Sequence, residues 1–198
     1  MNPKKRLTAI VIHIFAGAHA ASAALLAQTM VGDEAVLTAL TVAMILAICR
    51  IHGMSATIKN ALGFLGILAG FYVGTRTAMF LIKWMPAIGN GANAISTVFT
   101  TEVIGWAVYA LVSTGRSIDD VTKQEADELI RKGKEYRREN IENKRKIKKT
   151  IIGMSESDKS EYHRMMEQLK SQDLSEEKRD HLLRELDDLF KKYEGSQS

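Results

Sequence analysis

The distribution of charged side chains constrains this chain more than any other feature of its sequence. Residues 7–113 hold only seven acidic or basic side chains, whereas residues 114–198 hold twenty of each sign. A segment so poor in charge has to bury most of its side chains, either in a protein core or in lipid. The sequence therefore predicts two unlike halves, a hydrophobic helical domain over residues 1–115 and a highly charged helical remainder.

Four apolar segments make up the hydrophobic half, and short polar breaks separate them. Asp33 is suited to cap the second segment, and Met85-Pro86 ends the third because proline has no amide proton to donate. We therefore expect an all-α fold that starts with a four-helix hydrophobic bundle rich in glycine and alanine. Its helices should cover about residues 7–30, 35–51, 55–84 and 92–113.

A membrane suits these segments, although the pattern leaves alternatives open. The loop charges fit four crossings with both termini cytoplasmic, but the second apolar run is shorter than the ~20 residues that a crossing usually needs. Two membrane-inserting hairpins and a water-soluble bundle remain possible. The basic start at Lys4–Arg6 also resembles a signal peptide, but small apolar residues continue through Ala27, which favours a first helix.

Glycines recur along the third segment at spacings of three and four residues. On a helix they form a narrow stripe that another backbone can approach closely, as in lipid-embedded helix pairs. Each glycine would cost roughly 1 kcal/mol relative to alanine in an aqueous helix, so four of them predict a helix-packing stripe, within one chain or between chains. The stripe consists of Gly63, Gly66, Gly70 and Gly74.

Glu102 lies in the middle of the fourth apolar segment, where an isolated carboxylate is costly. If the third and fourth helices are antiparallel, Arg76 lies near the same height, and we expect a buried ion pair between them. A gate or a polar-ligand site is the alternative. His13 and His19 are six residues apart and do not share a helix face, so we predict no metal site. The single Cys49 excludes an internal disulfide.

The charged half divides into two segments. Residues 116–152 are predicted to form a charged stalk, whose helix opens at the capping box Ser117-x-x-Asp120 and runs through Lys149. Its apolar positions are sparse, so we expect the stalk to be exposed. A basic cluster near its end could contact lipid phosphates, and nucleic acid is disfavoured because no aromatic residues are interleaved with it. The cluster consists of Lys144, Arg145, Lys146, Lys148 and Lys149.

Residues 153–198 are predicted to form an amphipathic two-helix tail. Ser155 caps the first helix, and the second carries an unbroken apolar stripe. A hairpin of this size cannot bury its stripes alone, which implies self-association, docking on the stalk or a partner protein. The predicted tail interaction face is Leu182, Leu183, Leu186, Leu189, Phe190 and Tyr193.

Two blocks of the hydrophobic half resemble a known family. Leu37–Gly53 and Lys83–Trp106 are similar to the signature blocks of the YcjF-type bacterial helical domain family of unknown function, whose members occur alone or behind Era-like GTPase domains. The resemblance covers roughly residues 17–113 and implies an α-helical, membrane-associated domain without known catalysis. The matching positions include Lys83, Pro86, Gly89, Asn93, Thr101, Gly105 and Trp106.

Together these features predict a non-enzymatic, membrane-associated helical protein that acts by protein–protein interaction or oligomerisation. No residues form a recognisable catalytic or cofactor-binding pattern, and the chain contains no phosphate-binding loop, so any GTPase partner is expected to be a separate protein. We expect a bacterial inner-membrane location with the tail in the cytoplasm, the alternative being the cytoplasm. A pore-forming or membrane-perturbing protein and a soluble helical adaptor are the alternative functions.

Overall fold

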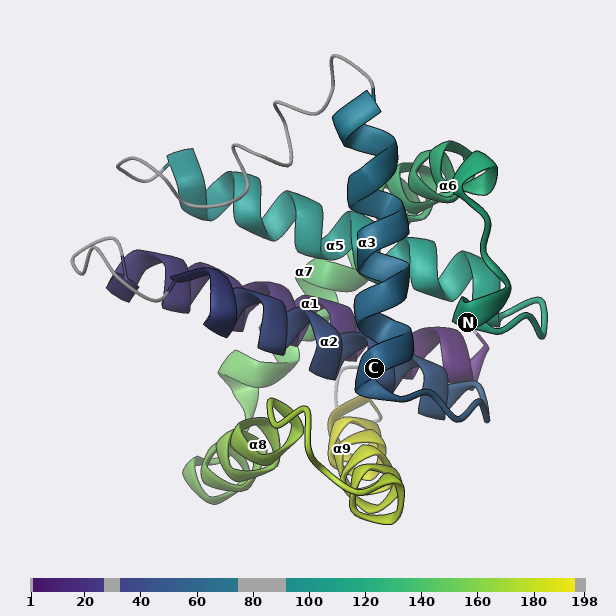
Figure 1. Ribbon diagram of the computed structural model, residues 1–198. Helices are drawn as coiled ribbons and strands as arrows, with labels where there is room; N and C mark the ends of the chain where they lie inside the picture. Colours follow the sequence, from purple (N-terminus) through teal and green to yellow (C-terminus); the bar gives the residue numbers. More distant parts are fainter. Residues whose placement is uncertain (1, 27–32, 75–91, 195–198) are drawn as a thin grey trace.

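The computed structural model describes residues 2–26, 33–74 and 92–194, and all the regular structure in those residues is helical. This confirms the all-α prediction. Figure 1 shows the arrangement. The α-helices are α1 (Pro3–Leu26), α2 (Asp33–Ile51), α3 (Ile58–Gly74), α5 (Ala92–Val112), α6 (Ala126–Glu139), α7 (Ile141–Gly153), α8 (Glu156–Leu169) and α9 (Glu176–Glu194), with 3₁₀ turns η1 (Ile118–Asp120) and η2 (Lys123–Glu125) before α6.

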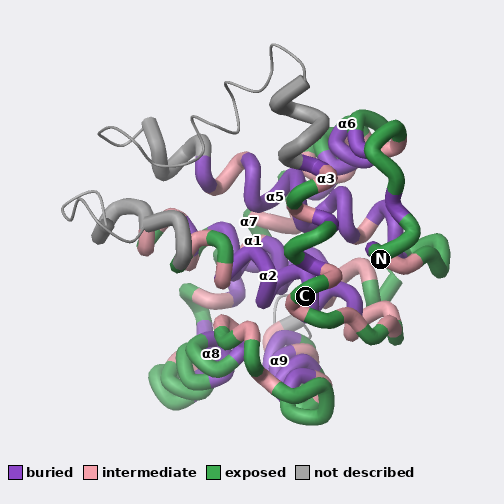
Figure 2. Tube along the Cα trace, in the orientation of Figure 1, coloured by how far each residue is buried: buried purple, intermediate pink, exposed green. Residues whose placement is uncertain are grey.

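The core is built on α1, α2 and α5, which run side by side, while α3 crosses in front of them (Figure 1). Side chains from all three inner helices are fully buried, among them Phe15, Met44 and Trp106. The buried positions cluster where these helices meet (Figure 2). An apolar helix with no polar face needs neighbours on every side, and these helices are each other's neighbours. Trp106, one of the family-motif positions, lies in this core.

Two glycines allow the helices around α5 to approach closely. A Cβ at Gly105 would lie 2.6 Å from a side-chain carbon of Ile12 on α1. A Cβ at Gly133, on α6, would lie only 2.4 Å from the backbone oxygen of Val103 on α5. Gly105 is one of the positions that match the family's signature block. Nothing in the sequence around Gly133, in a charged helix, indicated that this glycine lies at a close helix contact.

The prediction that residues 116–152 form an exposed stalk is wrong, because α6 packs along α5 and contributes to the same hydrophobic core. Ala126, Leu129 and Ile130 are buried against it, and few large side chains suffice because Gly133 brings the two backbones together. The capping box at Ser117 and Asp120 is present, but it opens the 3₁₀ turn η1. The helix expected through Lys149 is interrupted at Asn140, between α6 and α7.

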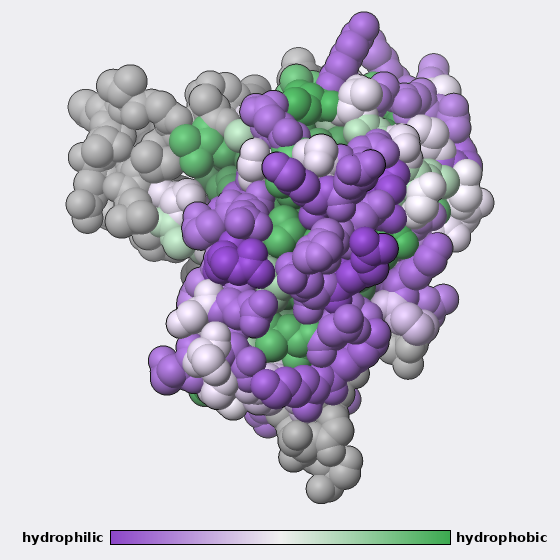
Figure 3. Space-filling view, turned by 90° about the horizontal axis from the view of Figure 1, so that it is seen from below, coloured by the Kyte–Doolittle hydropathy of each residue, from purple (hydrophilic) through white to green (hydrophobic). Residues whose placement is uncertain are grey.

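The C-terminal helices α8 and α9 pack against each other, and α9 also contacts α2 and α7. Ser155 caps α8 as predicted, its side chain accepting a hydrogen bond from the backbone N–H of Asp158. The chain itself therefore covers the tail interaction face. Leu182, Leu183, Leu186, Leu189 and Phe190 are buried, and Tyr193 is half-buried with its hydroxyl donating to Asp158. The outward surface of this hairpin is mostly hydrophilic (Figure 3).

Residues from α1 through α9 belong to one hydrophobic core, so the three segments predicted from the sequence pack on one another. Within the described residues, none of the helices combines enough length with enough apolar character to cross a lipid bilayer.

Candidate functional site

The charged cluster around Glu102 contains the most buried carboxylate among the described residues. Glu102 lies in the middle of α5 and is only 1% exposed. Its Oε2 accepts a hydrogen bond from Nε of Arg137, on α6, at 2.8 Å, and its Oε1 accepts one from Nζ of Lys144, on α7, at 2.6 Å. Nδ1 of His13, on α1, lies 3.2 Å from the same Oε1. One carboxylate thus joins four helices.

These partners explain how an apolar helix tolerates a buried charge. Burial is the largest influence on Glu102 and favours the protonated form, but the hydrogen bonds and charges of His13 and Lys144 outweigh it and lower its pKa to about 2. Arg137 also lies over the ring of Phe99, 4.5 Å from its centroid, which helps to hold the guanidinium in place. A carboxylate with such a low pKa remains charged at neutral pH and is poorly suited to general acid–base chemistry.

The ion pair that was expected between Glu102 and Arg76 stays a prediction, because Arg76 lies outside the described residues. The sequence correctly indicated that Glu102 needs cationic partners. It did not indicate Arg137 and Lys144, since both belong to the segment that was expected to form an exposed stalk. Their only sequence signal is the density of basic residues between 131 and 149.

The two N-terminal histidines occupy separate places. His13 joins the Glu102 cluster, whereas the buried His19 lies with Nδ1 2.9 Å from the backbone oxygen of Phe15 and Nε2 3.0 Å from that of Leu37. Burial lowers the pKa of His19. In the part of the chain that the structure describes, no three His, Cys, Asp or Glu side chains are grouped so that they could hold a metal ion.

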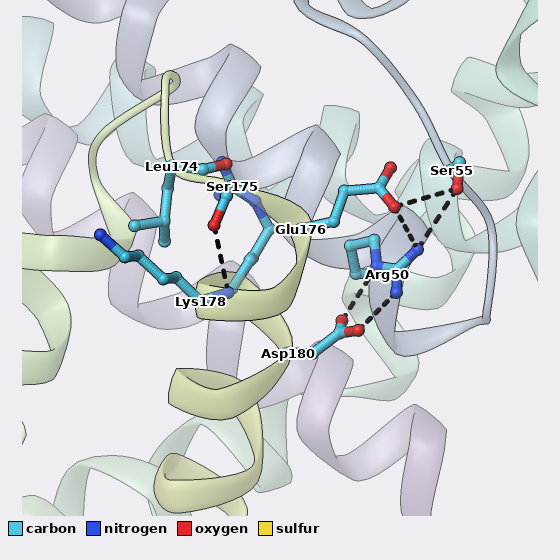
Figure 4. A network of polar contacts seen from close by, with 8 residues as sticks. Arg50, Ser55, Leu174, Ser175, Glu176, Lys178 and Asp180 are labelled. Carbon is cyan, nitrogen blue, oxygen red and sulfur yellow. Dashed lines mark hydrogen bonds and ion pairs between the residues drawn. The ribbon is translucent and has the colours of Figure 1, made fainter.

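A second polar network fastens the C-terminal hairpin to α2 (Figure 4). Nε of Arg50, at the end of α2, donates to Oδ1 of Asp180 at 2.9 Å, and a second nitrogen of the guanidinium pairs with Oδ2. Nη1 of Arg50 also donates to Glu176 at 2.9 Å, and Ser55 donates to the same carboxylate oxygen. The side chain of Arg50 is 19% exposed, so solvent screens its ion pairs with Asp180 and Glu176 only in part.

Arg179, next to this network, is 2% exposed and donates to backbone oxygens that include those of Ala43 on α2 and Ser171 after α8. It therefore links the turn between α8 and α9 to α2. Two pockets, of about 290 and 530 Å³, flank Arg50. Each of them is lined by both acidic and basic side chains. No local pattern in the sequence indicates these ion pairs, because the partners of Arg50 lie more than 120 residues away.

The predicted glycine stripe is only partly described. Gly63 and Gly66 are exposed, and a Cβ built at either one would meet nothing within 4 Å. No other part of the described chain therefore packs against these two glycines. The surroundings of Gly70 and Gly74 lie outside the described residues.

The family-motif positions are also divided. Lys83, Pro86 and Gly89 lie outside the described residues, and Asn93 is in the first turn of α5. The remaining positions face the core: Thr101 and Trp106 are fully buried, and Gly105 lies against α1.

Comparisons with protein families, with curated proteins and with solved structures found no match to this chain. The resemblance to the YcjF-type family therefore stays a prediction.

Proposed function

We propose that this protein is non-enzymatic and acts by association, and that two copies bind each other through a face of α3 that no described residue of the chain covers. The face is defined by Lys59, Leu62, Gly63 and Gly66, which are all exposed. It deepens the sequence-based expectation of an interaction or oligomerisation protein by naming the surface.

The single observation that carries this proposal is a glycine-containing helix face that the described part of the chain leaves exposed, with an exposed leucine beside the glycines. Leu62 is 44% exposed, one of four large hydrophobic residues so exposed in the described chain. Gly66 follows it by one helical turn, with open space where its Cβ would be. Two glycines in a water-exposed helix would each cost roughly 1 kcal/mol relative to alanine, a cost that a close helix–helix contact can offset.

A second copy is the partner that suits this face best. In a two-fold interface the same patch lies on both sides, so a flat glycine surface meets another flat glycine surface, and the two backbones approach closely. Leu62 of each copy would then be removed from water. Burying a leucine side chain completely gains about 1.5–3 kcal/mol, so two partly exposed copies supply a useful part of a dimer's stability.

Other parts of the sequence-based expectation remain further proposals. A membrane as the setting of this association, a separate GTPase as an additional partner and a pore formed by several copies are each compatible with an exposed apolar helix. The contact through α3 is the part of the proposal that the described residues support directly, and it is tested first.

Sedimentation velocity of the full chain over a range of concentrations tests the proposal. We expect a dimer or larger assembly for the wild type and a monomer for Gly66→Leu, because the leucine side chain would separate the two backbones. Gly17→Leu is the matched control, since Gly17 is also an exposed helical glycine with nothing within 4 Å of an added Cβ. A wild type that stays monomeric at about 0.2 mM, or equal assembly of both variants, would contradict the proposal.

A further inference from the structure

The outer side of α7 carries an exposed stripe that combines aliphatic and basic side chains. Ile141, Arg145, Lys148 and Ile152 follow one another at spacings of four, three and four residues, which places them in one line along a helix. We call these four residues the α7 stripe. Ile152 is 64% exposed, more than any other large hydrophobic residue that is described, and Ile141 is 44% exposed.

The stripe points outward because the opposite side of α7 is held in the fold. Ile147 and Thr150 are buried on that side. Lys144 is drawn inward, with its ammonium 2.6 Å from the carboxylate of Glu102. Since α7 is fixed in rotation by these contacts, the exposure of its isoleucines is a property of the packed structure and not of a loose helix.

We propose that the α7 stripe binds the surface of an anionic lipid bilayer. An interfacial helix inserts aliphatic side chains at the boundary between headgroups and acyl chains, while its lysines and arginines contact lipid phosphates. The stripe offers both kinds of side chain in one line. Exposed Lys149, one helical turn after Arg145, adds positive charge beside the stripe, and the acidic residue of α7, Glu142, is paired with Arg145 at 2.5 Å.

The exposed isoleucines favour lipid over nucleic acid. Proteins that bind single-stranded nucleic acid stack aromatic rings on the bases, and α7 has no aromatic residue. A duplex would be bound through phosphates alone, which gives the two isoleucines no role. A bilayer surface accounts for the charges and for the isoleucines together.

This inference is independent of the proposed self-association, because it uses a different helix. Gly66→Leu is expected to abolish dimerisation without abolishing lipid binding, although a monomer binds a vesicle less tightly when it loses its second contact. The two proposals can therefore fail separately.

Co-sedimentation of the full chain with vesicles provides the test. The two kinds of vesicle are phosphatidylcholine alone and phosphatidylcholine with about one third phosphatidylglycerol. We expect binding to the anionic vesicles that is lost in high salt, and little binding to the neutral ones. Arg145→Gln with Lys148→Gln should weaken it about 30-fold, at about five-fold for each charge. Ile152→Ser should weaken it roughly ten-fold.

Matched controls separate a specific stripe from overall charge. Arg164→Gln with Lys178→Gln removes one exposed arginine and one exposed lysine from the C-terminal hairpin, and Val36→Ser shortens an apolar side chain that is 43% exposed. Both controls should bind anionic vesicles as the wild type does. The proposal is overturned if the α7 variants bind like their controls, if neutral vesicles bind equally well, or if the chain binds a DNA duplex and ignores the vesicles.

Discussion

Replacing Glu102 by glutamine tests whether the buried carboxylate holds the charged half of the chain on the hydrophobic half. The fall in the pKa of Glu102 from 4.5 to about 2 corresponds to about 3 kcal/mol of folding free energy at neutral pH, at 1.36 kcal/mol per pKa unit. The side chains of Arg137 and Lys144 are 26% and 43% exposed, so after the substitution they can turn toward water. We therefore expect Glu102→Gln to lower the free energy of unfolding by about 2–3 kcal/mol, less than the full cost of stranding a buried charge.

The pH dependence distinguishes this explanation from a simple packing defect. Because the pKa of Glu102 is lower in the folded than in the unfolded state, its contribution is complete above pH ~5 and is lost as the pH falls from about 4.5 toward 2. The difference in stability between the wild type and Glu102→Gln should therefore shrink by about 2 kcal/mol between pH ~7 and pH ~3. Comparing the two proteins removes the contributions of other carboxylates, such as Asp158, whose pKa is also lowered to about 2.

Urea unfolding followed by far-ultraviolet circular dichroism at both pH values measures these differences. Glu135→Gln is the matched control, because it makes the same change in an exposed i,i+4 pair with Arg131, for which we expect less than about 0.5 kcal/mol. A Glu102→Gln protein that is as stable as this control at neutral pH, or that differs from the wild type by the same amount at both pH values, would refute the reasoning.

Three further predictions concern packing, docking and reactivity. Gly133→Ala should destabilise the protein by about 2 kcal/mol in urea unfolding, because its Cβ would lie 2.4 Å from a backbone oxygen of α5, whereas Gly17→Ala, with open space around it, should stabilise by about 0.5–1 kcal/mol; equal effects would show that α6 does not approach α5 as described. Arg50→Gln should speed amide hydrogen exchange in α9 by about ten-fold and leave exchange in α5 unchanged, since the ion pair of Arg50 with Asp180 holds α9 on α2. Unchanged exchange in α9 would show that this ion pair does not hold the helix in place. Cys49 is buried with its pKa raised to about 12, so an aromatic disulfide reagent should react with it only after denaturant is added, and rapid reaction at neutral pH would contradict its burial.

Much of the architecture follows from local sequence signals. The capping patterns at Ser117 and Ser155 depend on residues three apart in the chain, and the structure has both caps. The apolar stripe of α9 was identified as a face to be buried, since its spacing alone defines the face. The cost of a lone carboxylate among apolar residues was equally local, so the need of Glu102 for cationic partners was evident before its partners were.

The packing of residues 116–152 against α5 could not be predicted from local sequence signals. Few apolar residues between 116 and 152 suggested an exposed helix, because the usual argument assumes that large side chains fill the space between two helices. At Gly133 the backbones of α5 and α6 touch instead, so a few small and medium side chains complete the contact. The importance of that glycine is invisible until the neighbouring helix is in place.

The sequence by itself determined the helical class, the segregation of charge and the faces that each amphipathic helix had to bury, because those properties depend on residues within one or two helical turns. Only the tertiary structure decided which faces meet. Glu102 finds its cations 35 and 42 residues later, and Arg50 finds its carboxylates 126 and 130 residues later. Any of the many basic residues between 116 and 149 carries a charge that could satisfy Glu102. The choice among them was made by the packing of α6 and α7 against α5, which also left the isoleucines of the α7 stripe facing outward.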